Sequence, residues 1–301
     1  MWGELNMTVA EAHRIEREFY NNPKPSEDDV FLFTEAMDYI IHTTQDPNAM
    51  MSLGGYFYDE RKFDLALKYY EMAAEYKIDI AYECLGYIWY YGRTGTRDYE
   101  KAFYYFKLAK DAGNIVAAYK LADMYKNGYY VEKDYDAYCK IIEELYPKVK
   151  DSANLGDPLP EIFTRLARIR VGQGRKDEAI QLYYSAKDFL AQRISYNAFF
   201  GYLNIMMWLE DDLYKLVDFD EADFDLYDLY HLAKAPIKVR FYFDGKPQEW
   251  EVVEEDGEQV IRFNDKWYRT REDFFAKACI DGLPLTHIYD TLYGFEVISC
   301  S

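Results

Sequence analysis

A sequence motif that recurs four times limits the folds that this chain can adopt. Each copy starts with Leu-Gly or Leu-Ala and runs through a turn to an alanine followed by aromatic residues. The copies start at Leu53, Leu85, Leu121 and Leu166. Because such a unit cannot bury its apolar face alone, the copies must stack on one another. A stack of this kind presents a long surface, which favours a protein that holds another molecule.

The copies differ in their turns and agree elsewhere. From the leucine to the alanine after the turn there are 13 residues in the first and fourth copies, 17 in the second and 16 in the third. A second alanine follows seven residues later at Ala73, Ala109 and Ala186. Insertions are tolerated best in surface turns. We therefore expect stacked helix pairs in which two short-turn units flank two long-turn units.

Small residues mark where the two helices of a pair cross. Gly86 and Ala102 of the second copy are expected to lie in such a crossing. A bulky residue at either position would force the helices apart, at a cost of about 1–3 kcal/mol.

The second copy carries the most specific pattern. Its residues are Ala81, Leu85, Gly86, Tyr90, Gly92, Gly95, Asp98, Lys101, Ala102, Tyr105, Ala109 and Gly113. This pattern resembles a Sel1-like repeat, which differs from a tetratricopeptide repeat mainly in its longer, glycine-bearing turn. The third copy is similar, and the first and fourth resemble short-turn tetratricopeptide repeats. The resemblance covers about residues 47–190 and implies an α/α superhelix with a concave face.

Segments around the copies indicate further helices. Residues 1–45 contain two, one from about Thr8 to Tyr20 and one capped by Ser26, which we expect to cap the stack. Asp46-Pro47 starts the repeat domain as N-cap and first helical residue. Prolines and a glycine interrupt the helical pattern before the fourth copy, at Pro147, Gly156, Pro158 and Pro160. Further helices are expected over 195–216 and up to Ala235.

At Pro236 the pattern changes to period two. Ile237, Val239 and Phe241 alternate with polar residues, which indicates a half-buried strand. Further strands are expected at 250–252, 261–263, 266–268 and 295–299, with a helix from Thr270 to about Ile280. A segment as short as 236–301 has only a marginal hydrophobic core. We therefore expect it to dock on the helices or on a partner.

The predicted fold class is therefore mainly α. It is an α/α superhelical solenoid of Sel1/TPR-like helix pairs with a small C-terminal α+β domain. The expected domains are N-terminal capping helices at 1–45, the helical repeat domain at 46–235 and the small α+β domain at 236–301.

Charge, cysteine spacing and apolar content limit the classes of function that this chain can have. The net charge of −19 opposes binding to nucleic acid or to an anionic membrane. Four scattered cysteines without CxxC spacing read as reduced thiols. The first residues lack a signal-peptide pattern, and no stretch has the roughly 18 apolar residues of a membrane span. We therefore expect a cytoplasmic protein.

Catalytic motifs find little support. His13, His42, His231 and His287 show no HExxH or metal-ligand spacing, and no Walker loop, GxSxG or GxGxxG occurs. His287 precedes Asp290 by three residues, but a surface histidine is the simpler reading. Gly172-Gln173-Gly174 falls at a turn between helices. We therefore expect no enzyme activity, no cofactor and no metal.

An acidic segment spans 210–228. Its spacing lacks the glycine and final glutamate of a calcium loop. A solvated helix face is the default reading, and a docking patch is the alternative. Interleaved apolar residues, such as Leu213 and Phe224, show that the segment also packs against something.

The resemblance implies that the first helix of each copy lines the concave groove. Carried over, the groove residues are Tyr58, Asp59, Glu83, Tyr87, Tyr90, Tyr91, Tyr119, Asp123, Lys126, Asn127 and Arg168. This set predicts a tyrosine-rich, mildly acidic trough suited to an extended peptide or a basic helix. The alternative is that half of these tyrosines fill helix–helix seams. A basic set that clamps a C-terminal carboxylate is not recognisable.

The leading interpretation is a non-catalytic intracellular scaffold that binds a protein or peptide ligand in the groove. One alternative is an acidic partner that neutralises a basic protein, because a charge of −19 speeds such an encounter. Another is a hydrolase, since some secreted Sel1-like proteins are linked to β-lactam binding or hydrolysis. Those carry paired cysteines, whereas Cys84 and Cys139 stand alone in their copies.

Overall fold

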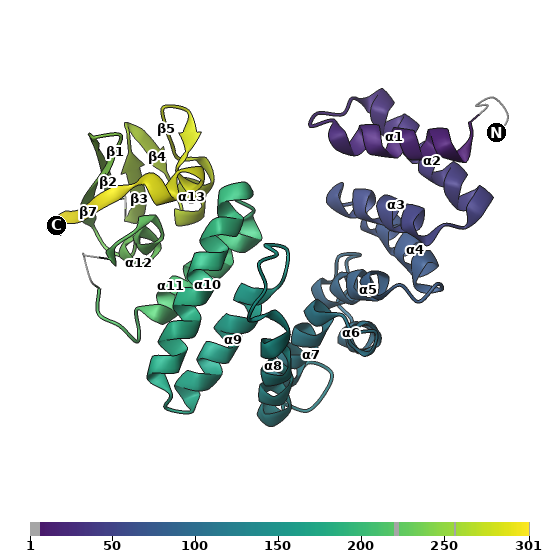
Figure 1. Cartoon of the computed structure of the whole chain (residues 1–301), viewed down its shortest axis with the longest axis horizontal. Helices are drawn as coiled ribbons and strands as arrows, with labels where there is room; N and C mark the ends of the chain where they lie inside the picture. The colour runs from purple at the N-terminus through teal and green to yellow at the C-terminus, as the bar shows by residue number, and fades with distance from the viewer. Residues whose placement is uncertain (1–6, 220–222, 256, 301) are drawn as a thin grey trace. The chain divides into compact units, whose positions relative to one another are not determined.

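The computed structural model describes residues 7–219, 223–255 and 257–300, without the side chains of residues 200, 299 and 300. It confirms the predicted fold class, with helical repeats followed by a small antiparallel sheet (Figure 1). The chain divides into two compact units, Met1–Ile141 and Ile142–Ser301, called unit 1 and unit 2 below. The domain boundaries at 45/46 and 235/236 stay predictions.

Unit 1 is built from consecutive antiparallel helices. They are α1 (Val9–Asn21), α2 (Glu27–Thr44), α3 (Pro47–Asp59), α4 (Phe63–Ala74), α5 (Asp79–Tyr91), α6 (Tyr99–Asp111), α7 (Ile115–Asn127) and the first half of α8 (Tyr135–Val149). Helix α3 packs on α4 and α5 on α6, as the first two copies predict. Helix α5 also contacts α7, so the first helices of successive copies are neighbours.

Local signals fix the helix ends. Thr8 and Ser26 form capping boxes that begin α1 and α2, and Asp46 caps α3 ahead of Pro47, so these predicted starts are confirmed. Gly92 and Gly128 end α5 and α7 in the left-handed conformation, which only glycine adopts without steric cost.

Glycines also set the distance between paired helices. A Cβ at Gly54 would lie 2.5 Å from the Tyr70 ring, and one at Gly86 would lie 2.5 Å from the Phe106 ring. Tyr70 and Phe106 are both buried. Each glycine therefore makes room for one aromatic ring of the second helix, as the sequence predicts for Gly86.

Unit 2 continues with helices and ends in a sheet. The helices are α9 (Leu159–Gly172), α10 (Lys176–Tyr196), α11 (Phe200–Leu213), the 3-10 turn η2 (Leu226–Asp228), α12 (Leu229–Leu232) and α13 (Arg271–Lys277). In the described residues five strands form an antiparallel sheet in the order β4-β3-β2-β1-β7. These are β1 (Ile237–Phe243), β2 (Lys246–Glu255), β3 (Glu258–Phe263), β4 (Lys266–Tyr268) and β7 (Tyr293–Cys300). Short β5 (Cys279–Ile280) pairs with β6 (Leu283–Pro284), and the 3-10 turns η3 (Leu285–His287) and η4 (Tyr289–Thr291) precede β7.

Several predicted boundaries in unit 2 are wrong. The helix expected over 195–216 spans only Phe200–Leu213, as α11. It starts later than expected because α10 continues to Tyr196 and residues 197–199 are not helical. The helix expected to reach Ala235 is only the short α12. Helix α13 ends at Lys277 because Cys279–Ile280 pairs as a strand. Pro147 lies inside α8, where its missing N–H costs one bond in the last turn.

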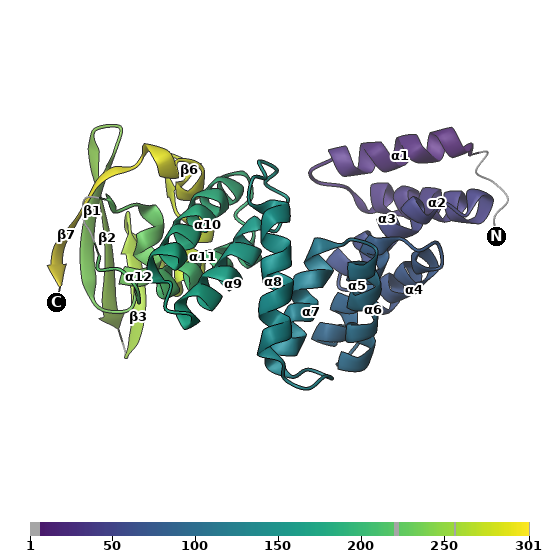
Figure 2. The same ribbon diagram turned by 60° about the horizontal axis from the view of Figure 1, so that its bottom comes forward.

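The sheet packs on helices of its own unit. Trp250 and Phe241 from the sheet share one buried cluster with Leu190 of α10 and Met206 of α11. Figure 2 shows the sheet beside these helices. The expectation that the C-terminal part docks on the helices is therefore confirmed. None of the helices in the described part of the chain combines the length and apolar character that crossing a membrane requires.

Candidate functional site

A group of tyrosines on α5 surrounds one lysine of α7. The Lys120 ammonium lies 5.2 Å from the ring centre of Tyr87, 5.8 Å from that of Tyr90 and 5.7 Å from that of Tyr91. Its Nζ also donates to the Tyr91 hydroxyl at 3.3 Å, and the Tyr119 ring lies 5.5 Å away. An ammonium is attracted to the face of an aromatic ring at these distances. We call Lys120 with these four tyrosines the tyrosine cage.

The cage tyrosines differ in exposure. Tyr91 is 41% exposed, whereas Tyr119 is only 6% exposed. Tyr87 and Tyr90 are half-buried. Burial and the neighbouring Tyr119 raise the pKa of Tyr87, and burial followed by Asp123 raises that of Tyr90. Tyr119 thus fills a seam, and Tyr91 presents its ring to solvent.

An acidic group lies on the same side of α5. Asn114, the N-cap of α7, donates from its amide to Glu83 at 2.8 Å and to Asp79 at 3.3 Å. The same side chain accepts from the backbone N–H of Ala117. Burial raises the pKa of Glu83, and the Asn114 bond partly offsets this. Asn114 therefore ties the start of α7 to the α5 face.

The remaining predicted groove residues are placed as follows. Tyr58 is half-buried and Asp59 exposed at the end of α3, and Asp123 and Lys126 are half-buried on α7, next to exposed Asn127. Arg168 belongs to unit 2, where its Nε donates to Asp212 at 2.7 Å. The structure thus gathers the cage residues and Glu83 and assigns Arg168 to a different unit. Their role in binding stays a prediction.

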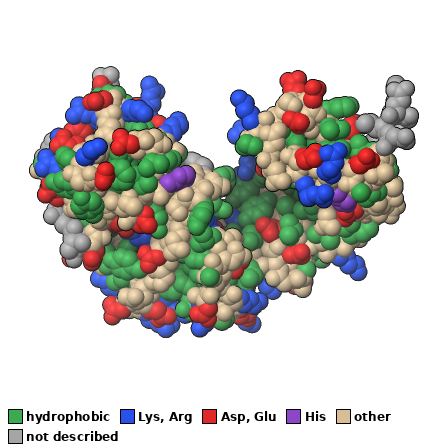
Figure 3. All heavy atoms as spheres, turned by 45° about the horizontal axis from the view of Figure 1, so that its top comes forward, with side chains coloured by type: hydrophobic (Ala, Val, Ile, Leu, Met, Phe, Trp, Pro, Cys, Tyr) green, Lys and Arg blue, Asp and Glu red, His purple; other side chains and the backbone are tan. Residues whose placement is uncertain are grey.

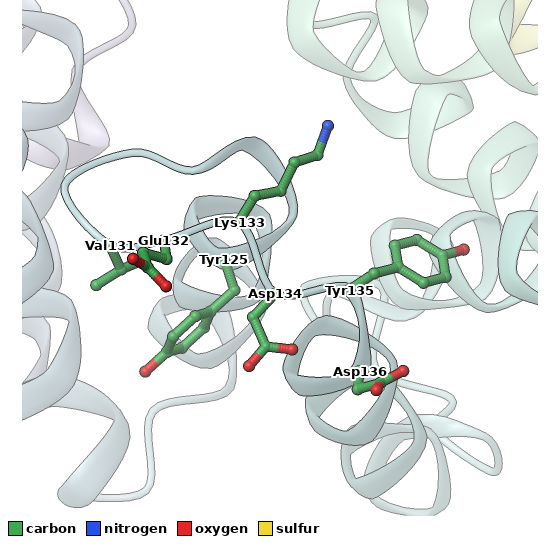
Figure 4. A pocket seen from close by; sticks show the side chains of 7 residues that line it. All are labelled: Tyr125, Val131, Glu132, Lys133, Asp134, Tyr135 and Asp136. Carbon is green, nitrogen blue, oxygen red and sulfur yellow. The ribbon is translucent and has the colours of Figure 1, made fainter.

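A hollow at the α7–α8 loop carries acidic side chains. It is lined by Tyr125, Val131, Glu132, Lys133, Asp134, Tyr135 and Asp136. Figure 4 shows Lys133 extending away from the other labelled side chains. Asp134 accepts from the backbone N–H of Ala137 at 2.8 Å. This hollow is a capped helix start, and no cluster of His, Cys, Asp or Glu suited to a metal ion occurs among the described residues.

The acidic segment of unit 2 is partly core, so the default reading of a solvated face is wrong there. The Lys187 ammonium lies 3.0 Å from Glu210, 3.1 Å from Asp225 and 2.8 Å from Asp228. Lys187, Glu210 and Asp228 are buried. Burial alone would lower the pKa of Lys187, but the three carboxylates outweigh it and raise that pKa. The four residues are called the Lys187 cluster.

Glu210 is the unusual member of the Lys187 cluster. Its side chain is fully buried, and apart from the Lys187 ammonium, which lies 3.0 Å from one oxygen, its carboxyl group has no hydrogen-bond partner within the described structure. Burial raises its pKa to about 8, although Lys187 opposes the shift. Asp228 in contrast accepts from the Tyr214 hydroxyl at 2.7 Å. Glu210 therefore holds its proton to a higher pH than an ordinary glutamate does.

Cys84 lies beside the repeat leucine on α5. It is half-buried and makes no disulfide. Burial and the neighbouring Glu83 raise the pKa of its thiol to about 12. A thiol with this pKa is almost wholly protonated at neutral pH and therefore a poor nucleophile.

Comparison with known proteins identifies the repeats. The Sel1 repeat family matches residues 47–75, 84–114 and 115–137. These three segments are Sel1 repeats. The first Sel1 repeat has the short turn that resembles a tetratricopeptide repeat, yet it matches the Sel1 family; the fourth copy lies outside the matched segments.

The solved structures that match this chain include a Sel1 repeat protein from Oxalobacter formigenes. It is 21% identical, with a TM-score of 0.49 over 68% of this chain and 78% of that chain. The protein c5321, a protective antigen of uropathogenic Escherichia coli with an SLR fold, is 15% identical. Its TM-score is 0.49 over 71% of this chain and 51% of that chain. No curated protein matches this chain.

Successive Sel1 repeats are joined by cations that sequence reasoning missed. Lys120 of the third repeat reaches back over the second-repeat tyrosines, as described above. Arg93 of the second repeat lies 5.8 Å from the Tyr58 ring and 5.6 Å from the Phe63 ring of the first. Lys120 precedes the repeat leucine, where the earlier copies have Ser52 and Cys84. The sequence pointed to Lys120 only in that a charged residue stands where the earlier copies have small ones.

Proposed function

We propose that unit 1 is a non-catalytic interaction module that holds a peptide segment of a protein partner on the side formed by α3, α5 and α7. The tyrosine cage carries this proposal, because it fixes half-exposed aromatic rings around a central ammonium. Sel1 repeats supply the scaffold, and helix pairs of this kind commonly serve protein interaction.

Tyrosine suits such a surface for physical reasons. Its ring offers a large apolar contact and its hydroxyl a hydrogen bond, and it loses little conformational entropy on binding. Here the rings are already ordered, since the parallel Tyr87 and Tyr91 rings stack with centres 5.9 Å apart. Ordering before binding lowers the entropic cost of capturing a ligand.

The experiment compares capture by two double variants in native lysate. Tyr87→Ala with Tyr91→Ala should abolish retention of the partner while the far-ultraviolet circular dichroism stays unchanged. Tyr104→Ala with Tyr130→Ala is the matched control, because both tyrosines are exposed on unit 1 outside the cage, and it should retain the partner. Unchanged capture by the first variant would refute the proposal, and loss of its fold would show that these tyrosines are core.

The proposal places this module in the cytoplasm. The acidic-inhibitor alternative rests on the net charge of −19 and predicts an association rate that falls steeply with ionic strength. The tyrosine cage predicts a weaker salt dependence, because ring contacts supply much of its affinity. Turnover of an ester, phosphate or lactam substrate above the blank would instead support the hydrolase alternative.

A further inference from the structure

A second hollow of unit 1 is cationic. It lies where the α3–α4 turn meets the α5–α6 turn and has a volume of about 370 Å³. Its lining residues are Arg61, Lys62, Phe63, Asp64, Leu65, Arg93 and Thr94. Three cations and one carboxylate give it a local charge of +2, in a chain whose net charge is −19. We call it the cationic hollow.

The cations of this hollow lack acidic partners. Within the described residues, none of Arg61, Lys62 and Arg93 forms an ion pair with a carboxylate. The equivalent turn of the fourth copy behaves differently, because Arg175 there is paired with Glu178. In a chain with 54 acidic and 35 basic residues, three neighbouring cations without a carboxylate partner are available to a ligand.

Arg93 is held in place before any ligand arrives. Its guanidinium lies 5.1 Å from the Tyr91 ring centre, in addition to the Tyr58 and Phe63 rings. Its Nε donates to the Tyr58 hydroxyl at 3.1 Å. Stacking leaves the edge of a guanidinium free to donate to a carboxylate. Arg93 is thus ordered by aromatic rings and keeps donors for an anion.

Arg61 occupies a backbone conformation that favours glycine. Its φ is 57°, and the residue at the same distance before the repeat alanine in the fourth copy is Gly174, with φ 74°. A Cβ brings a steric cost in this region that glycine avoids. The strained backbone at Arg61 favours a role for its side chain.

We propose that the cationic hollow binds an aspartate or glutamate side chain of the peptide that unit 1 holds. This proposal rests on the proposed function, because Tyr91 contacts both Arg93 and Lys120 and so joins the hollow to the tyrosine cage. The start of α4 adds donors, since Lys62 caps it without a side-chain hydrogen bond. The partner therefore carries an acidic residue beside the segment that covers the tyrosines.

The test is a titration of the full chain with N-acetyl-glutamate amide, followed by amide chemical shifts. We expect shifts confined to residues 61–65 and 93–94. N-acetyl-glutamine amide, which has the same shape and no charge, should produce none. Absence of shifts in these residues, or equal shifts with the glutamine probe, would overturn the proposal.

Two variants of equal charge sharpen the titration. Arg61→Gly with Lys62→Gln should weaken glutamate binding by about tenfold or more, and it should fold normally because Gly174 serves the same turn in the fourth copy. Arg97→Gln with Lys107→Gln removes the same charge outside the hollow and should leave the affinity unchanged. If both double variants weaken glutamate binding equally, net charge alone accounts for the effect and a specific site in the cationic hollow is refuted.

The readouts separate this proposal from the proposed function. If the tyrosine variant loses its partner but the glutamate probe does not bind, the interaction surface stands and the acidic anchor is wrong. If the probe binds but the tyrosine variant captures as before, the cationic hollow stands as an anion site and the proposed peptide surface fails.

Discussion

Unit 1 and unit 2 both use lysine and arginine to join elements, but they neutralise these charges differently. In unit 1, Lys120 and Arg93 lie over tyrosine rings of the preceding repeat. In unit 2, Lys187 is enclosed by three carboxylates, and Arg193 pairs with Glu161 at 3.0 Å. A ring attracts a cation without cancelling its charge, whereas a carboxylate cancels it. Lys120 and Arg93 of unit 1 therefore keep positive charge available to a ligand, whereas carboxylates neutralise Lys187 and Arg193 of unit 2.

The largest expected effect comes from removing the charge in unit 2. Lys187→Met would leave buried Asp228 and its neighbour Asp225 without their cation, and leaving a buried carboxylate unpaired costs about 3–5 kcal/mol. Chemical denaturation followed by hydrogen exchange in α10 and β1 measures the loss. Lys215→Met is the control, because this lysine is 70% exposed in its pair with Asp212 and should change stability by less than about 0.5 kcal/mol. A Lys187 variant as stable as the control would show that the Lys187 cluster does not stabilise unit 2.

The second prediction concerns pH. The pKa of Glu210 is raised to about 8 in the folded chain from an ordinary 4.5. The folded state therefore holds a proton that the unfolded state releases, and this stabilisation is lost as pH rises through the window between these values. Within the window the slope approaches about 1.4 kcal/mol per pH unit.

Glu210→Gln tests that slope. The neutral amide mimics the protonated acid, so the dependence of stability on pH should flatten between pH 4.5 and 8. Glu132→Gln removes an exposed glutamate in unit 1 and should leave the slope unchanged. An unaltered slope in the Glu210 variant would show that another group holds the proton.

Two adjacent glycines test the seams of unit 1. Gly54→Ala places a Cβ against the buried Tyr70 ring, which should destabilise the chain by about 1–3 kcal/mol. Gly55→Ala meets nothing closer than 4.0 Å and should stabilise α3 by up to about 1 kcal/mol through helix propensity. Thermal unfolding of both variants gives the measurement. If both variants stabilise the chain equally, helix propensity rather than contact with the Tyr70 ring determines the effect of an alanine at Gly54.

The smallest effect is expected at the tyrosine cage. Lys120→Met keeps the length of the side chain and removes its charge, so unit 1 should lose about 0.5–1 kcal/mol of cation–π stabilisation. Lys107→Met, on exposed α6 surface, is the matched control. A loss as large as that of Lys187→Met would show that the two units do not differ in the way proposed.

The repeat fold could be predicted because it depends on local patterns. The sequence predicted a helix crossing at Gly86 and a helix cap at Ser26, and both roles follow from neighbouring residues alone. The break at Pro236 likewise predicted β1 from its alternation. Boundaries failed where tertiary contact decided, as at Cys279–Ile280, which pairs as a strand.

The charge arrangement could not be predicted in the same way. Lys187 and Asp228 lie 41 residues apart, and no local pattern reports that they meet. A run of aspartates is usually solvated, which is why the burial of Asp228 escaped notice. For the candidate site, the groove positions carried over from the repeat family included Tyr87 and Tyr91 but not Lys120, because the earlier copies have Ser52 and Cys84 at that position.

Cys84 has a practical consequence for watching unit 1 at work. Its thiol, with a pKa raised to about 12, resists alkylation while α5 stays packed, so its labelling rate reports transient opening of the repeat rather than intrinsic reactivity. It shares α5 with Tyr87 and Tyr91. A bound peptide that holds α5 against its neighbours would slow that labelling. The labelling rate of this native cysteine would therefore report ligand occupancy.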